Sequence, residues 1–172
     1  MTEVEAPPGQ GNHGAVGRRP IEDGDLDFLY RLYASTREDE LSVTPWSAEE
    51  KETFLRMQFR AQHEHYQAHF PAAEYSLLLR EGQPVGRLYV DRRPDEIRLI
   101  DIALVPAARN EGLGGALLRE LMAEAEGGAK PLRIHVEQFN PARRLYDRLG
   151  FRKIEDQGVY HLMEWSGPSS PE

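Results

Sequence analysis

The residues from Arg109 to Gly115 form a glycine-rich turn directly after an apolar segment. Such a turn lets backbone N–H groups converge at the start of a helix, where the helix dipole also favours an anion. Glycines at positions 112 and 114 remove the Cβ atoms that would hold a pyrophosphate away from the backbone. The expected chemistry is phosphate binding by main-chain amides. The alternative is a tight turn that only starts a helix, and this segment alone does not decide between them.

The spacing of these glycines excludes two common phosphate-binding motifs. A dinucleotide-binding fingerprint would need a third glycine at position 117, which is Leu117, and a P-loop would need a Gly-Lys-Ser/Thr sequence that the turn lacks. A second segment, from Phe139 to Phe151, begins a helix at Asn140-Pro141 and ends it at Gly150. By itself it predicts an amphipathic helix in which Tyr146 is a core residue with its hydroxyl hydrogen-bonded.

Together, the two segments resemble the GNAT superfamily of N-acetyltransferases. The sequence Arg109-x-x-Gly112-x-Gly114 matches the cofactor signature of that family, and Asn140-Pro-Ala-x-x-Leu-Tyr146-x-x-Leu-Gly-Phe matches its second conserved block. One predicted helix and one predicted strand separate them, which is the family order. The resemblance covers about residues 75–165 well, and it implies an acyltransferase that uses acetyl-CoA as co-substrate, without a metal.

The resemblance also implies which residues contact the coenzyme. Asn140 and Tyr146 would face the sulfur, although many members of the family place the asparagine one residue earlier, where this chain has Phe139. The pantetheine arm would pair with the backbone of a splayed central strand, and the pyrophosphate would lie on the amides of the turn. The residues assigned to these two contacts are Ile102, Ala103, Leu104, Arg109, Asn110, Glu111, Gly112, Leu113, Gly114 and Gly115.

Acetyl transfer to an amine needs a base and an acid. An alkyl ammonium has a pKa near ~10, so a base must remove its proton before the nitrogen attacks the thioester carbonyl. Asp101 and Glu137 are the candidate bases, and Asp101 could equally serve a structural role by pairing with Arg98 or Arg87. For protonation of the leaving thiolate, the resemblance points to Tyr146.

The acceptor pocket is expected between the first two helices, their connecting loop and the last strands. Acidic residues there suit a cationic amine, whereas Arg37 suits a carboxylate, so both a small-molecule and a peptide amine stay open. A non-catalytic coenzyme-A-binding sensor or interaction module with the same fold is the alternative function. The substrate-binding candidates are Tyr33, Arg37, Trp46 and Gln62.

The elements that must position these residues follow from hydrophobic periodicity and turn residues. They predict a single-domain α/β (α+β) fold with the order β-α-α-β-β-β-α-β-α-β-β, a mixed and mostly antiparallel sheet of six to seven strands, and about four flanking helices. Asp25 is expected to cap the first helix. We expect a disordered leader over residues 1–17, the N-acetyltransferase domain over 18–165, and a flexible tail over 166–172.

Composition narrows the functional classes. The net charge of −8 argues against nucleic-acid binding, and no apolar run is long enough to span a membrane. The absence of cysteine excludes disulfides and fits a cytoplasmic protein. His65 and His69 lie four residues apart, with His63 nearby, but a solvated helix face explains them better than a metal site. The sequence leaves monomer and homodimer equally open.

Overall fold

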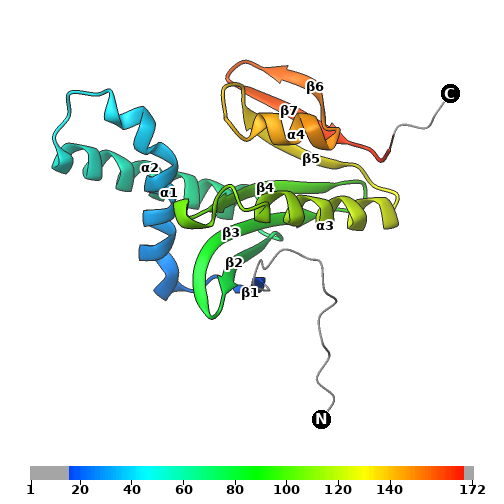
Figure 1. Cartoon of the computed structure of the whole chain (residues 1–172), viewed down its shortest axis with the longest axis horizontal. Coiled ribbons are helices and arrows are strands. Elements are labelled where there is room, and N and C mark those ends of the chain that lie inside the picture. The colour runs from blue at the N-terminus through cyan, green and yellow to red at the C-terminus, as the bar shows by residue number, and fades with distance from the viewer. Residues whose placement is uncertain (1–15, 169–172) are drawn as a thin grey trace, which may run out of the picture.

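A seven-stranded mixed sheet runs through the structure, a computed structural model that describes residues 16–168 (Figure 1). Its strand order is β1-β2-β3-β4-β5-β7-β6; β4 and β5 are parallel, and the other described pairs are antiparallel. The strands are β1 (Val16–Pro20), β2 (Glu74–Arg80), β3 (Gln83–Arg92), β4 (Ile97–Leu104), β5 (Leu132–Glu137), β6 (Arg152–Gln157) and β7 (Tyr160–Trp165).

Four α-helices cover the two faces of this sheet. In Figure 1, α3 (Leu113–Gly127) and α4 (Arg143–Leu149) lie in front of the strands, while α2 (Ala48–His69) passes behind them. The helix α1 (Leu26–Ser42) packs with α2. Each helix buries an apolar stripe: Leu117, Leu118 and Leu121 of α3 are at most 4% exposed. The sheet is therefore the middle layer of a sandwich with helices on both sides.

Two hydrophobic clusters hold these layers together. The larger lies between the sheet and the helices α3 and α4, and includes Leu99, Leu132 and Met163, all of which are 0% exposed. The smaller lies between the sheet and the helices α1 and α2, around Tyr33, Phe59 and Leu77. Fully burying one such side chain contributes about 1.5–3 kcal/mol. The smaller cluster covers only part of the sheet face toward α1 and α2. The rest of that face has room for polar side chains.

The predicted fold class and element order are confirmed, and three local predictions are corrected. The first strand begins at Val16, two residues before the predicted start of the domain at residue 18. The helix predicted at Asn140 begins at Arg143, because the Asn140 side chain accepts a hydrogen bond from the Ala142 N–H and holds a turn there. Asp25 stands at the start of α1 without capping it, because its carboxylate binds the Arg19 guanidinium at 2.7 Å.

The predicted termini lie mostly outside the described residues. This applies to residues 1–15 of the proposed leader and to residues 169–172 of the proposed tail. Across residues 16–168, the helices lack the combination of length and hydropathy that crossing a lipid bilayer requires.

Candidate active site

The parallel strands β4 and β5 diverge partway along their length. They pair over only three residues each, with Ile97 to Leu99 opposite Leu132 to Ile134. Beyond that point β4 continues to Leu104 and pairs only with β3 among the described strands. Toward β5, this stretch has no strand partner, and the backbone groups on that side are those of Ile102 and Leu104. This is the splay on which the predicted pantetheine contact depends. The predicted contact at Ala103 is corrected, because the Ala103 carbonyl faces Gly86 of β3.

The glycine-rich turn presents a row of free amides at the start of α3. Gly112 stands at the N-cap with a left-handed φ of 82°, and Asn110 also has a positive φ, 62°. Within residues 16–168, the backbone N–H groups from Asn110 through Gly115 donate to no protein acceptor. A Cβ built on Gly114 would meet only Leu104 Cδ1, at 4.0 Å. Open space and converging donors at a helix N-terminus fit a pyrophosphate.

Two arginines fix the position of this turn. The Arg109 side chain donates from Nε to the Leu104 carbonyl at 2.9 Å and from Nη2 to Ser35 Oγ of α1 at 2.9 Å. Arg80 of β2 binds the Glu111 carboxylate at 2.7 Å. The acid in the turn is thus paired with a cation, which reduces its repulsion of a phosphate. Neither long-range contact is visible in the sequence.

A β-bulge directs Asp101 toward the α2 side of the sheet. Tyr89 pairs with Asp101 whereas its neighbour Val90 pairs with Leu99, so Ile100 is an extra residue in β4. Side chains alternate along a strand, and without the bulge Asp101 would share the apolar α3 face with Leu99. The bulge reverses the alternation. Asp101 therefore reaches the polar groups on the opposite face.

Asp101 lies in a buried network rather than alone. Its Oδ2 accepts hydrogen bonds from Arg87 Nη2 at 2.7 Å and from the Tyr66 hydroxyl of α2 at 3.0 Å. Arg87, only 3% exposed, also donates to Gln62 Oε1 at 3.0 Å. Of the two arginines considered as partners for Asp101, Arg87 is the one observed. Gln62, a substrate candidate, has its side-chain oxygen occupied by this arginine.

Tyrosines surround this network. Burial, reinforced by the Asp101 carboxylate, raises the pKa of Tyr66 well above its usual range. Burial likewise raises the pKa of Tyr89 to about 12, although Arg87 acts in the opposite direction. The Tyr89 hydroxyl is buried and has no hydrogen-bond partner among the described residues. These phenols consequently stay protonated at neutral pH.

Tyr146 approaches the site from the opposite face. It lies on α4, is 4% exposed, and packs edge-on against Phe151 with ring centroids 5.6 Å apart. Burial raises the pKa of Tyr146, and the Asp101 carboxylate adds to the effect. Tyr146 is thus protonated at neutral pH and can act as a proton donor. Asn140 is exposed, and its side-chain oxygen is occupied by the turn described above.

Glu137 ends β5 at the mouth of the splay and pairs with Arg37 of α1 at 3.3 Å. Arg37 also stacks over the Tyr33 ring, with 5.5 Å from Cζ to the centroid. Burial raises the pKa of Tyr160 of β7, and the Glu137 carboxylate raises it further. The structure thus brings together Tyr33, Arg37 and Glu137 from the predicted set. Trp46 packs on Phe54, with ring centroids 5.1 Å apart.

Comparisons with known proteins agree with this geometry. The sequence model of the acetyltransferase (GNAT) family matches residues 27–151. The chain belongs to the GNAT acetyltransferase family. It is 31% identical over 147 residues to a [ribosomal protein bS18]-alanine N-acetyltransferase of Haemophilus influenzae, covering 82% of this chain and 84% of that one.

Solved structures of GNAT proteins share the fold. A PaiA N-acetyltransferase of Thermoplasma acidophilum in complex with coenzyme A superposes with a TM-score of 0.65 at 16% identity, covering 89% of this chain and 99% of that one. The ribosomal-protein-S18-alanine N-acetyltransferase of Escherichia coli gives a TM-score of 0.54 at 23% identity, covering 87% and 91%. The chain is thus an N-acetyltransferase, and its acyl donor is acetyl-CoA.

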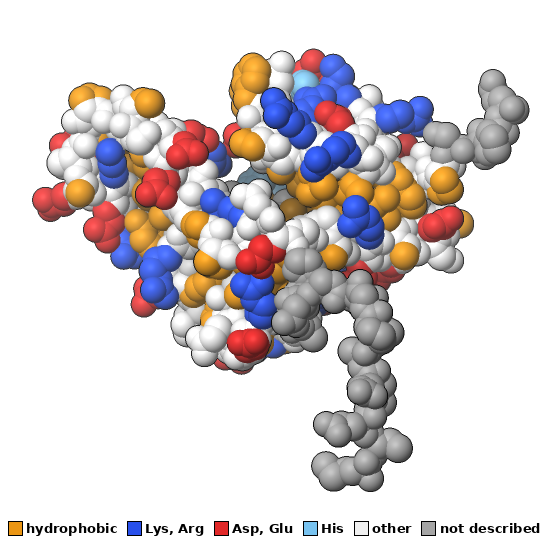
Figure 2. All heavy atoms as spheres, viewed as in Figure 1, with side chains coloured by type: hydrophobic (Ala, Val, Ile, Leu, Met, Phe, Trp, Pro, Cys, Tyr) orange, Lys and Arg blue, Asp and Glu red, His pale blue; other side chains and the backbone are white. Residues whose placement is uncertain are grey.

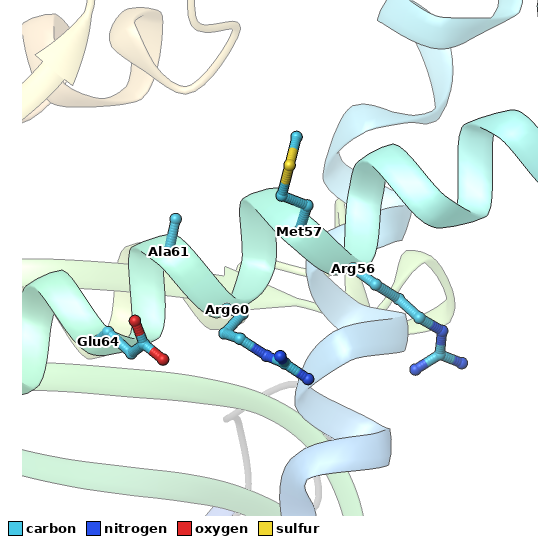
Figure 3. Close-up of a pocket in the computed structure, with 5 residues that line it drawn as sticks. All are labelled: Arg56, Met57, Arg60, Ala61 and Glu64. Atoms are coloured by element: carbon cyan, nitrogen blue, oxygen red, sulfur yellow. The ribbon is translucent and has the colours of Figure 1, made fainter.

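Two other features of this GNAT protein lie outside the site. An open depression on α2 is lined by Arg56, Met57, Arg60, Ala61 and Glu64, all from one helix face (Figure 3). That face is opposite to the one through which Phe59, Gln62 and Tyr66 meet the sheet side. Among residues 16–168, no three His, Cys, Asp or Glu side chains lie close enough together to hold a metal ion. The ring centroids of His65 and His69 lie 4.0 Å apart.

Sequence reasoning did not assign several residues of the site a role there. Tyr66 was not predicted to contact Asp101, and Arg109 was assigned to the coenzyme only through the backbone amides of the turn, not through its side chain. Arg87 was predicted as one of two possible partners of Asp101, and a lone arginine interrupting an apolar strand favours such a buried pairing. Asp101, on the next strand, is the carboxylate that pairs with Arg87.

Proposed function

We propose that this chain acetylates the free α-amino group at the N-terminus of a protein, and that a ribosomal protein is the first acceptor to test. By its name, the Haemophilus influenzae relative acts on an alanine of ribosomal protein bS18. The similarity extends over most of both chains. A protein N-terminus is a primary amine on a flexible chain, which is an acceptor that an open site can admit.

The observation that carries this proposal is an open notch with a carboxylate beside it. Figure 2 shows the notch between the lobe of α1 and α2 and the lobe of β5, β6, β7 and α4. Glu137 ends β5 at this side, and the residues next to it are apolar and exposed: Phe139 is 89%, Val159 68% and Tyr160 46% exposed. Because exposed apolar clusters mark binding surfaces, this rim suits an extended peptide better than a small enclosed amine.

The residues divide the chemistry between the two ends of the site. Acetyl-CoA supplies a thioester, and in the transfer a bond forms between the amine nitrogen and the acetyl carbon while the carbon–sulfur bond breaks. We assign removal of the amine proton to Glu137, directly or through water, because the Asp101 carboxylate is held by the buried Arg87. The Leu104 N–H, on the unpaired β4 edge, stabilises the charge that develops on the carbonyl oxygen. Tyr146 protonates the leaving sulfur.

Two short peptides test the proposal. One begins with a free alanine and contains no lysine, and the other has a blocked N-terminus and one internal lysine. We expect acetylation of the first only, read by mass spectrometry. The rate should rise with pH and level off near pH ~8, because an α-amino group has a pKa of about 7.7–8.0 against about 10.4 for lysine. Acetylation of the lysine peptide alone would refute the α-amine assignment.

A ribosomal acceptor also implies a place of action. Ribosomal proteins are made and assembled in the cytoplasm, and a cysteine-free chain gains nothing from an oxidising compartment. We therefore propose a cytoplasmic enzyme, as monomer or homodimer. Co-fractionation with ribosomal subunits during their assembly would support this localisation.

A further inference from the structure

One ion pair crosses the splay between the two halves of the molecule. Arg37 comes from α1 and Glu137 from the end of β5, and Arg37 Nη2 lies 3.3 Å from Glu137 Oε1. Both side chains are partly accessible, at 27% and 31%. Glu137 is three residues beyond Ile134, the last β5 residue that pairs with β4. The pair therefore stands where an acceptor must enter.

Arg37 has other partners that do not depend on Glu137. Its Nη1 lies 3.1 Å from Glu40 Oε1, three residues further along α1, and its guanidinium stacks over Tyr33. Glu40 is 62% exposed and has room to follow the arginine. Burial by itself would lower the pKa of Arg37, but Tyr33, Glu137 and Glu40 outweigh it and raise the pKa. The guanidinium can thus leave Glu137 and remain stabilised.

Glu137 has no such alternative among the described residues. Arg37 is its ion-pair partner, and the other neighbour identified, Tyr160, is a neutral phenol. A partly buried carboxylate that loses its cation costs more free energy than one that exchanges it for another. An incoming ammonium group supplies the replacement cation.

We propose that Arg37 occupies the place of the acceptor's ammonium group on Glu137 in the free enzyme, and that the acceptor displaces it toward Glu40. The inference rests on the proposed function, because it takes the acceptor to be a cationic amine. Charge is balanced throughout: Glu137 carries a guanidinium before binding and an ammonium after it. Arg37 is then a specificity-determining residue, because a neutral acceptor cannot compensate for the ion pair that it breaks.

This exchange makes a prediction of unusual sign. Replacing an arginine in a binding site normally weakens binding, but here the arginine competes with the acceptor. The variant Arg37→Gln should lower the acceptor KM by about three- to ten-fold, the range for a partly exposed ion pair of roughly 0.7–1.4 kcal/mol. The KM for acetyl-CoA should not change. Glu137→Gln should raise the acceptor KM by about ten-fold or more, because the carboxylate is the anchor, and it should also lower kcat, because Glu137 is the proposed base.

The experiment is a double-variant cycle on a short peptide that begins with a free alanine. In the Arg37→Gln/Glu137→Gln double variant, the gain from Arg37→Gln should vanish, because Arg37 no longer competes for anything. Arg56→Gln is the matched control, since Arg56 forms an exposed ion pair with Glu52 on α2. A higher acceptor KM in Arg37→Gln, or additive effects in the double variant, would overturn the proposal.

A second measurement separates this inference from the proposed function. Calorimetric titration of the same peptide into the full-length protein with bound coenzyme A reports acceptor affinity without turnover. Tighter binding by Arg37→Gln supports the exchange even if the peptide is acetylated slowly, and weaker or equal binding contradicts it. Failure of the wild-type protein to acetylate any α-amine overturns the proposed function, whatever the cycle shows.

Discussion

The substitution Gly114→Ala separates the two roles that a glycine-rich turn can have. Gly114 is the second residue of α3, its φ lies outside the left-handed region, and a Cβ there would meet nothing closer than 4.0 Å. Alanine therefore fits without strain. Glycine in a helix is less favourable than alanine by about 0.5–1 kcal/mol, and removing it also restricts the unfolded chain. We expect the variant to be more stable than the wild type, with a Tm about 1–4 °C higher.

Coenzyme binding should change in the opposite direction. We expect the added methyl group to crowd the free amides from Asn110 to Gly115 and to keep a pyrophosphate from close approach. Loss of a single charge-assisted hydrogen bond costs about 1.5–3 kcal/mol, so the Kd for acetyl-CoA should rise by roughly 10- to 150-fold. Only phosphate binding by these amides predicts higher stability together with lower affinity.

The assay combines calorimetric titration of acetyl-CoA with thermal unfolding of the free protein. Gly127→Ala is the control, because Gly127 ends the same helix and a Cβ there would meet nothing within 4 Å. It should raise the Tm and leave the Kd unchanged. An unaltered Kd in Gly114→Ala would place the phosphates elsewhere. A lower Tm would mean that the turn itself requires glycine at this position.

Three further predictions concern Tyr146, Asp101 and His135. Tyr146→Phe should reduce kcat by about 10²-fold with little change in the Kd for acetyl-CoA, measured by thiol release, because only the proton donor is lost. Asp101→Asn should lower the free energy of unfolding, measured in urea, by about 3 kcal/mol, because it leaves the buried Arg87 guanidinium without an anion. The control is Glu52→Gln in the exposed pair with Arg56, which should change the free energy of unfolding by less than about 1 kcal/mol. Burial and Arg98 lower the pKa of His135. Below pH ~6.5 the unfolded chain therefore binds the proton more readily than the folded chain does, so the free energy of unfolding of the wild type should fall toward acid pH. His135→Gln should make this pH dependence less steep in urea titrations at different pH values. An unchanged pH dependence would contradict the prediction.

The order of the elements could be read from the sequence because it depends on local signals. Hydrophobic periodicity, the capping box at Ser47 and the glycine at 150 act within a few residues of where they stand. The glycine turn was found for the same reason. Where two local signals compete, the predicted boundary was wrong. Asn140 is a residue type that favours a helix N-cap, but its side chain stabilises a turn instead, and α4 begins at Arg143.

The partners of the polar side chains could not be read in this way. Ser35 and Arg109 are 74 positions apart, and Arg37 and Glu137 are 100 apart. No periodicity links such residues, because the sheet order and the packing of α1 decide which of them meet. The charges themselves were visible, and Arg37 and Glu137 were each selected as functional, but their mutual contact appears only in the folded chain.

The site forms where two irregularities of β4 coincide. Pairing with β5 ends at Leu99, and the next residue, Ile100, is the bulge. A regular β4 strand would not provide this site. Its edge would be hydrogen-bonded to β5 along its whole length, and Asp101 would face the apolar α3 side. In the proposed site, the diverging strands supply backbone groups for the donor, and the shifted alternation places polar side chains on the α2 face. Because the two changes begin at adjacent residues, the proposed donor and acceptor surfaces adjoin at one point of the sheet, as transfer of an acetyl group between them requires.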